Sequence, residues 1–251
     1  MSGRQYIEFM WFTRPFSALV QRMPGVCQIC DRWPSTAICP PCASRFGETR
    51  NRCTTCARPL FGQTQQCGAC LADRQPSTLA LCVAAVDYAY PWDTLIARFK
   101  FRGEPALAQA FAALMLHQPA VNALLNSGHW VVPIPVTPSR LAERGYNQAW
   151  ELAKALLQQS ASAAAQGLPS VLIRLGHAPD QHDLPAEQRV KNLKGAFACD
   201  PKIAAQLQGK HVILVDDVCT TGATLRAAAK ALHQAGASQV SATVFARTAA
   251  D

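Results

Sequence analysis

The segment Val212–Leu225, VILVDDVCTTGATL, constrains the fold of this chain more than any other. Four apolar β-formers lead directly into two adjacent carboxylates, Asp216 and Asp217. An Ala- and Leu-rich stretch with helical spacing follows from Ala223 to about Ala235. The pattern predicts a buried strand that ends in the carboxylates, a short loop of small residues, and then a helix.

The loop between this strand and this helix has the composition of a phosphate site. The first amides of a helix lack partners within it, and the hydroxyls of Thr220 and Thr221 add donors around them. Asp216 and Asp217 repel a phosphate, but they can accept hydrogen bonds from sugar hydroxyls nearby. Phosphate donors beside hydroxyl acceptors indicate a site for a ribose 5-phosphate.

The rest of the chain after residue 80 alternates between strand and helix patterns. Further strands are expected at Leu81–Tyr88, Trp130–Pro135, Val171–Arg174 and Gln239–Arg247, and helices at Pro91–Arg102, Glu104–His117 and Tyr146–Gln158. This alternation predicts an α/β fold with a doubly wound, mostly parallel sheet. Ligands of such sheets bind at the carboxyl ends of the strands, where Asp216-Asp217 and Pro133-Ile134 both lie. Residues 177–192 are polar and irregular, which is typical of a functional loop.

Eight of the eleven cysteines form four C-x-x-C pairs before residue 75: Cys27/Cys30, Cys39/Cys42, Cys53/Cys56 and Cys67/Cys70. Each pair can direct two thiolates at one metal ion, and two pairs complete a tetrahedral site. The intervals between pairs are too short to build a core, so folding here depends on metal. We expect two structural zinc sites. Sequential pairing is the simplest arrangement, and a cross-braced one stays open.

Composition and charge give partial information on the cellular location and on the binding partners of the protein. No apolar run approaches the roughly 20 residues that a membrane span needs, and the aromatic start of the chain does not resemble a signal peptide. We therefore expect the protein to be in the cytoplasm, where cysteine pairs are more often zinc ligands than disulfides. The formal charge of +8 falls to +4 if two zinc ions are each held by four thiolates, because each centre contributes 4 × (−1) + 2 = −2. That value fits anion-binding pockets as well as a nucleic-acid surface.

The strand, the Asp-Asp pair, the hydroxyl loop with its glycine and the helix together resemble the phosphoribosyl pyrophosphate (PRPP) motif of type I phosphoribosyltransferases. Neither a P-loop nor a G-x-G-x-x-G competes with it. With Val132–Pro135, the run Arg144–Gln148 and the C-x-x-C pairs, the chain resembles the ComF/GntX family from about Cys27 to Arg247. This implies a double zinc-ribbon module in residues 1–75 and a phosphoribosyltransferase-like domain in residues 80–251.

The resemblance implies roles for residues at the carboxyl edge of the sheet. Asp216 and Asp217 would hold the ribose hydroxyls. The 5′-phosphate would be wrapped by Thr220, Thr221, Gly222, Ala223 and Thr224. The pyrophosphate side and a flap would be formed by Pro133, Ile134, Arg140, Arg144, Arg189, Lys191 and Asn192. The PRPP would arrive with Mg²⁺ on its pyrophosphate.

Two functions follow from this resemblance. The first is a phosphoribosyltransferase with an acceptor that the sequence does not indicate, linked to natural competence or the use of external DNA. The second is a non-catalytic sensor of PRPP or a nucleotide, or an adaptor for single-stranded DNA, whose zinc module contacts DNA-uptake or DNA-processing proteins. Some of these residues also have simpler interpretations. Cys219 fits a packing residue, and the run Arg98-Lys100-Arg102 is more often a solvated helix face than a binding patch. Tyr146 and Asn147 fit a packing aromatic and a helix cap as well as ligand contacts.

Overall fold

The structure is a computed structural model that describes residues 25–73, 77–162, 164–175 and 195–249. Its helices are α2 (Pro40–Phe46), α3 (Gly68–Ala72), α4 (Trp92–Phe101), α5 (Leu107–Leu116), α6 (Pro119–Ser127), α7 (Pro138–Arg144), α8 (Gln148–Gln159), α10 (Pro201–Ala204), the 3-10 turn η2 (Ala205–Leu207) and α11 (Ala223–Gln234). Its strands are β1 (Cys82–Asp87), β2 (Trp130–Pro133), β3 (Gln166–Gly167), β4 (Leu172–Arg174), β5 (Phe197–Cys199), β6 (His211–Cys219) and β7 (Gln239–Arg247).

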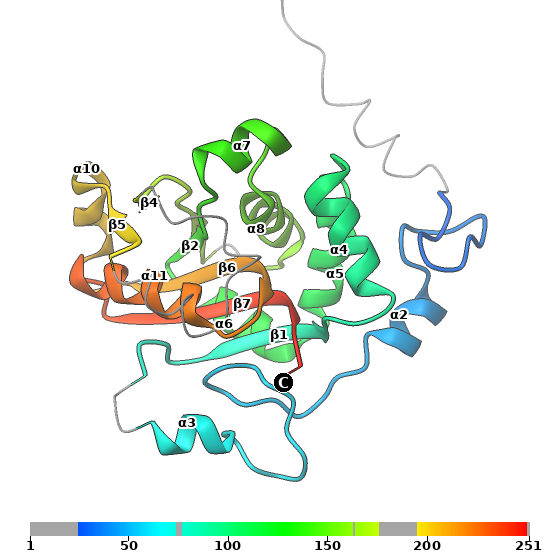
Figure 1. The fold of residues 1–251 in the computed structure, drawn as a ribbon, viewed down its shortest axis with the longest axis horizontal. Helices are drawn as coiled ribbons and strands as arrows, with labels where there is room; N and C mark the ends of the chain where they lie inside the picture. Colours follow the sequence, from blue (N-terminus) through cyan, green and yellow to red (C-terminus); the bar gives the residue numbers. More distant parts are fainter. Residues whose placement is uncertain (1–24, 74–76, 163, 176–194, 250–251) are drawn as a thin grey trace, which may run out of the picture. The chain divides into compact units, whose positions relative to one another are not determined.

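Five strands form one parallel sheet in the order β1-β7-β6-β2-β3, which confirms the predicted fold class (Figure 1). Strand β6 lies inside this sheet and is hydrogen-bonded to β2 on one edge and to β7 on the other. Its first five residues are all buried, as a strand covered on both faces requires. The carboxyl ends of β2, β6 and β7 therefore meet at one edge of the sheet.

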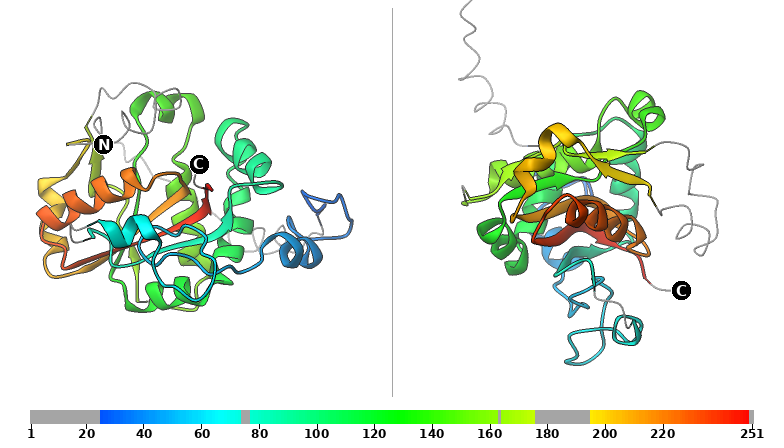
Figure 2. Two further views of the ribbon diagram at one scale, coloured as in Figure 1. Left: turned by 60° about the horizontal axis from the view of Figure 1, so that its bottom comes forward. Right: turned by 90° about the vertical axis from the view of Figure 1, so that its left-hand side faces the viewer.

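Helices cover both faces of the sheet. Helix α8 packs on β2 and β6, and α5 packs on β1 and β7, whereas α11 packs on β6 and β7 together with the two-stranded sheet β4-β5. Side chains alternate accordingly along β6, since Val212 and Leu214 belong to the hydrophobic core under α11. On the opposite face Phe245 of β7 stacks on Phe111 of α5, with ring centroids 4.0 Å apart. Figure 2 gives two further views of these layers.

The structure departs from the predicted elements in a few places. Strand β6 continues past both carboxylates to Cys219, because β7 pairs with it over that whole length. Strand β4 was expected in the main sheet, but it pairs antiparallel with β5 in a separate sheet. Helices α6 and α7 were not predicted, and α7, with seven residues, is too short to show a period. Its ends are nevertheless encoded, with Thr137 as N-cap and left-handed Gly145 as C-cap.

The chain divides into two compact units, one ending at Cys39 and one beginning at Pro40. The larger unit thus contains the last two C-x-x-C pairs as well as the parallel sheet. The division into a module of residues 1–75 and a domain of residues 80–251 remains a prediction, since packing does not test which segments fold independently. In the part of the chain that the structure describes, every helix is too short or too polar to cross a lipid bilayer.

Candidate functional site

Two adjacent carboxylates lie near the carboxyl end of β6. Asp217 is 6% exposed and Asp216 is partly buried, and the amide of Asp217 donates to Oδ1 of Asp216 at 2.9 Å. The neighbouring strand β2 ends beside them, because Pro133 pairs with Val215 and the amide of Ile134 donates to the Val215 carbonyl at 2.9 Å. The structure thus brings together the two segments that the sequence placed at the edge of the sheet.

The segment after β6 turns directly into α11. Gly222 is the N-cap of α11 with φ at 74°, a left-handed conformation that favours glycine, and it offers no capping side chain. Inside the turn, Oγ1 of Thr221 accepts from the amide of Ala223 at 3.3 Å. Arg226 donates from Nη1 to the Thr221 carbonyl at 3.1 Å, so it adds a positive charge beside the start of the helix. The N-terminus of a 12-residue helix therefore faces the end of the strand.

Lys100 of α4 is a site residue that the sequence did not reveal. Its Nζ lies 3.2 Å from Oδ1 of Asp217, and both side chains are largely buried. The interpretation of this helix face as solvated is therefore wrong for Lys100. Its neighbour Arg98 forms a separate ion pair with Glu104 at 2.6 Å. Only the tertiary contact between α4 and the end of β6 distinguishes the two cations.

The arginines after β2 lie on helix α7 and not in an irregular loop. Arg144 places its guanidinium 4.8 Å from the centre of the Phe101 ring, and its Nη1 donates to Oε1 of Gln148 at 3.2 Å. Its Nε is buried and has no acceptor within the described residues. Burial and the positive charge of Arg140 lower the pKa of Arg144. A nearby anion would stabilise the charged form of a guanidinium in this position.

Tyr146 and Asn147 have structural roles between α7 and α8. The hydroxyl of Tyr146 donates to the carbonyl of Phe99, which fastens this segment to α4. Asn147 is the N-cap of α8, since its Oδ1 accepts from the amides of Ala149 and Trp150, and its Nδ2 donates to the Ile134 carbonyl at 3.1 Å. These contacts favour the packing interpretation over direct ligand contact.

The flap residues Arg189, Lys191 and Asn192 lie outside the described residues. Their assignment to the site therefore remains a prediction.

The electrostatics of the carboxylate pair are unbalanced. Burial, and secondly the negative charge of Asp217, raise the pKa of Asp216 well above its ordinary value. Lys100 opposes this shift, but one cation does not compensate two adjacent carboxylates. Asp216 thus binds a proton more readily than a solvated aspartate, which suits a group that hydrogen-bonds to hydroxyls.

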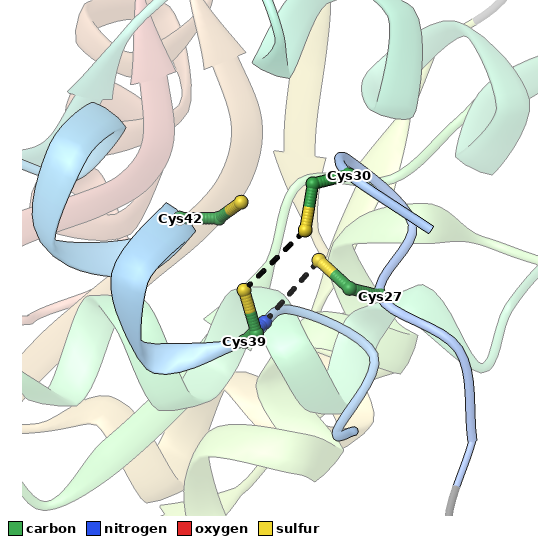
Figure 3. A group of neighbouring side chains, drawn as sticks. All are labelled: Cys27, Cys30, Cys39 and Cys42. Atoms are coloured by element: carbon green, nitrogen blue, oxygen red, sulfur yellow. Dashed lines mark hydrogen bonds between the residues drawn. The ribbon is translucent and has the colours of Figure 1, made fainter. Parts of the chain in front are cut away.

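The cysteines gather into two four-cysteine groups with sequential pairing. The first cysteine group is Cys27, Cys30, Cys39 and Cys42, and the second cysteine group is Cys53, Cys56, Cys67 and Cys70. In each group all Sγ atoms lie within 4.8 Å of one another. Figure 3 shows the first group, with the side chains of all four cysteines turned toward a common centre.

Sulfur separations in both groups fit a tetrahedral zinc site. The distance from Cys30 Sγ to Cys39 Sγ is 3.7 Å, and that from Cys56 Sγ to Cys67 Sγ is also 3.7 Å. A tetrahedron with Zn–S bonds of about 2.3 Å has edges of about 3.8 Å. Four thiolates leave no coordination position for a substrate, so both groups suit structural zinc.

Two of the remaining cysteines lie together near the base of the turn. Cys82 and Cys219 are both buried in the core under α11, as packing residues are expected to be. Hydrogen bonding from the Cys82 thiol lowers the pKa of Cys219 to about 7, against the effect of burial.

The sequence of this chain is similar to those of several known proteins. A family model described as the phosphoribosyl transferase domain matches residues 153–251, which include β6, the turn and α11. The DNA utilization protein YhgH of Escherichia coli K12 is 31% identical over 90% of this chain and 98% of its own length. Competence protein F of Haemophilus influenzae is 31% identical over 75% of this chain and 81% of its own length. Competence protein ComFC of Bacillus subtilis is 29% identical, covering 81% and 80%.

We predict that the purified chain contains about two zinc ions, one for each cysteine group. The double variant Cys30→Ser/Cys39→Ser should retain about one ion, because serine is a poor zinc ligand and the second group is separate. Native mass spectrometry checks the metal content. Cys82→Ser, which changes a cysteine outside both groups, is the control and should keep both ions. Loss of both ions in the double variant would contradict two independent sites.

Asp216→Asn should stabilise the unliganded protein against unfolding. A carboxylate whose pKa is raised in the folded state destabilises that state increasingly as the pH rises above its ordinary pKa of 3.8. The amide keeps the Oδ1 acceptor and removes the charge. Thermal unfolding followed upward from about pH 5 should therefore show a gain for the variant that grows with pH and then becomes constant above the folded-state pKa of Asp216. A midpoint lower than that of the wild type at each pH would show that the carboxylate is not under electrostatic strain.

Proposed function

Because this chain belongs to the ComF family of competence and DNA-utilization proteins, we propose that it binds PRPP at the carboxyl end of β6 and serves DNA uptake or the use of external DNA. The observation that carries the proposal is the continuity of Asp216-Asp217 with the glycine-capped start of α11. Acceptors for sugar hydroxyls and donors for a phosphate are thereby held on one rigid strand-to-helix connection.

The 5′-phosphate is assigned to the phosphate loop, residues 220–224. Gly222, the left-handed N-cap of α11, has no side chain to cap the helix, and Thr221 accepts only from the amide of Ala223, so the following amides of the first turn are proposed to meet the anion. The hydroxyls of Thr220, Thr221 and Thr224 add donors around that position. Arg226, anchored on the Thr221 carbonyl, supplies a nearby positive charge.

The ribose hydroxyls are assigned to Asp216 and Asp217. Carboxylates accept strong hydrogen bonds from hydroxyls, and a raised Asp216 pKa reflects an acceptor that lacks sufficient donors in the free protein. Lys100 holds Asp217 from the α4 side, and its charge is also available to an anionic substituent on the ribose. Binding of the sugar would thus relieve part of the repulsion between the two carboxylates.

The pyrophosphate side is assigned to the end of β2 and to helix α7. Pro133 and Ile134 lie beside β6, and Arg144 has a buried Nε with no acceptor in the described part of the chain. A guanidinium binds phosphate oxygens through paired planar hydrogen bonds, which suits Arg140 and Arg144 to this role. Mg²⁺ would accompany the pyrophosphate. Arg189, Lys191 and Asn192 are proposed to close over the ligand.

The same proposal includes the cellular location and the partners of the protein. The names of the relatives connect them with competence and DNA utilization. We assign this chain to the cytoplasm, where a protein that handles incoming single-stranded DNA meets PRPP. The cysteine groups, as closed structural sites, are suited to contact DNA or DNA-uptake proteins and not to catalysis.

Titration with PRPP and Mg²⁺ tests the site. The double variant Asp216→Asn/Asp217→Asn should weaken binding by about tenfold or more, because charge-assisted hydrogen bonds to the ribose become neutral ones. Asp93→Asn is the control, because it changes a carboxylate on the first turn of α4 that accepts from the amide of Thr94. Calorimetry measures both. Unchanged affinity in the double variant, or no binding by the wild type, would remove the assignment.

Turnover is measured by the release of pyrophosphate in the presence of single-stranded DNA or nucleobases. Release that depends on one of these acceptors supports a transferase. Tight PRPP binding without release for any acceptor supports the sensor or adaptor function.

Lys100→Ala should weaken PRPP binding by about tenfold, because Asp217 then lies buried beside Asp216 without its cation. Arg102→Ala removes the same charge from an exposed position next to α4 and should leave the affinity unchanged. The comparison is made by calorimetry at two salt concentrations. An equal loss in both variants would mean that the net charge of the region is responsible, and not the specific contact.

A further inference from the structure

A buried arginine connects the second cysteine group to the phosphate loop. Arg247 is the last residue of β7 and is 2% exposed. It pairs with Asp87 of β1 on one side and with Cys219 of β6 on the other. Its side chain donates from Nε to the Cys56 carbonyl at 2.9 Å and from Nη1 to the Cys219 carbonyl at 3.2 Å. One guanidinium thus bridges a metal-ligand turn and the end of the central strand.

The charge of Arg247 needs compensation that its immediate acceptors do not supply. Besides Cys56 and Cys219, its Nη1 donates to the carbonyl and the hydroxyl of Thr248, at 2.7 and 3.1 Å. All four acceptors are neutral, and a buried cation is costly without a nearby negative charge. Zinc held by four thiolates carries a net charge of −2. A metal-bound second cysteine group, to which Cys56 belongs, would therefore supply a counter-charge to Arg247, in addition to the Cys219 thiol, whose pKa the charge of Arg247 helps to lower.

At the cysteine end, the position of the Cys56 carbonyl depends on the fold of its turn. The next residue, Ala57, has φ at 57° and is fully buried in the core under α11. A left-handed conformation is unfavourable for alanine, so a constraint that holds this turn in place offsets a conformational cost. A metal ion that draws the Cys53 and Cys56 thiolates together supplies one.

At the loop end, Arg247 sets the direction of the first loop amide. The Cys219 carbonyl accepts from Arg247 and also from the amide of Thr248 at 3.1 Å. Because the peptide group is planar, the orientation of this carbonyl fixes the direction in which the amide of Thr220 points. Thr220 is the first residue of the phosphate loop, so its amide is one of the donors proposed to meet the 5′-phosphate.

The second cysteine group is also held to the sheet by contacts that do not involve Arg247. The amide of Cys82 donates to the Thr54 carbonyl at 2.7 Å. Arg52 donates to the Ala57 carbonyl at 3.3 Å and pairs with Asp87 at 2.8 Å. Loss of the Arg247 side chain therefore leaves this group docked, and its effect on the phosphate loop can be separated from unfolding.

We propose that Arg247 is a positioning residue that couples metal binding in the second cysteine group to PRPP binding at the phosphate loop. The inference rests on the proposed function, because it takes PRPP as the ligand of that loop. Coupling between two sites is reciprocal. Metal in the second cysteine group strengthens PRPP binding, and PRPP slows the loss of metal from that group. The first cysteine group is not part of this link.

The test measures zinc release to a chromophoric chelator from the full-length chain, with and without saturating PRPP and Mg²⁺. A Cys30→Ser/Cys39→Ser background leaves only the second cysteine group to report, and Cys53→Ser/Cys67→Ser leaves only the first. PRPP should slow release from the second group several-fold and leave the first unchanged. With Arg247→Met this protection should disappear, and PRPP should bind about tenfold more weakly although the zinc content is retained.

Matched variants and a ligand-free measurement separate positioning from plain stability. Arg52→Met removes another buried arginine contact of the same turn and should lower stability without abolishing the PRPP effect on zinc release. In the absence of PRPP, amide hydrogen exchange within residues 219–224 should be faster in Arg247→Met than in Arg52→Met.

Two negative results have different meanings. A wild-type protein that does not bind PRPP overturns the proposed function, and with it the ligand in this inference. Normal PRPP binding together with wild-type coupling and wild-type loop exchange in Arg247→Met overturns the role of Arg247 alone.

Discussion

The pairing of β6 with a neighbour on each edge is the constraint on which the rest of the structure depends. β2 and β7 both run parallel to it, so the three carboxyl ends meet at one place. The amide of Ile134 donates a hydrogen bond to the Val215 carbonyl there, and Arg247 pairs with Cys219 across the two strands. The two carboxylates proposed to bind the ribose are fixed through this pairing, and the phosphate loop begins directly where the pairing ends at Cys219. A turn held by the sheet in this way presents its donors without further ordering, and that lowers the entropic cost of binding an anion.

The charged side chains at the carboxyl edge of the sheet do not fully compensate one another. Two carboxylates share the end of one strand, and Lys100 compensates only one of them directly. Across from them Arg144 is partly desolvated and retains an unpaired donor within the described residues. A ligand that carries both hydroxyls and phosphates would provide donors for the carboxylates and an anion for Arg144. The free protein therefore holds these charges at an electrostatic cost that the proposed ligand would offset.

The parallel sheet and the strand–loop–helix unit could be predicted because apolar runs and the loop glycine are strong local signals. The spacing of the cysteines likewise predicted the metal sites. Helix α7 could not, since seven residues show no period, although Thr137 and Gly145 are good capping residues. Lys100 was misread for a different reason. Its sequence neighbours Arg98 and Arg102 are ordinary helix-face cations, and only the approach of α4 to Asp217 distinguishes it. The pairing of the cysteines likewise required the positions of the sulfur atoms.

The sequence alone determined the chemistry of this protein: adjacent carboxylates before a hydroxyl loop, and eight cysteines in four pairs. Those signals are local, because residue type and spacing within one segment are enough to specify them. Only the tertiary structure decided which distant groups act on that chemistry. It placed Lys100 against Asp217, and it joined Cys56 to Cys219 through Arg247, across 191 and 28 residues of chain. Such contacts arise from the packing of β7 and α4 around β6, which no local pattern records.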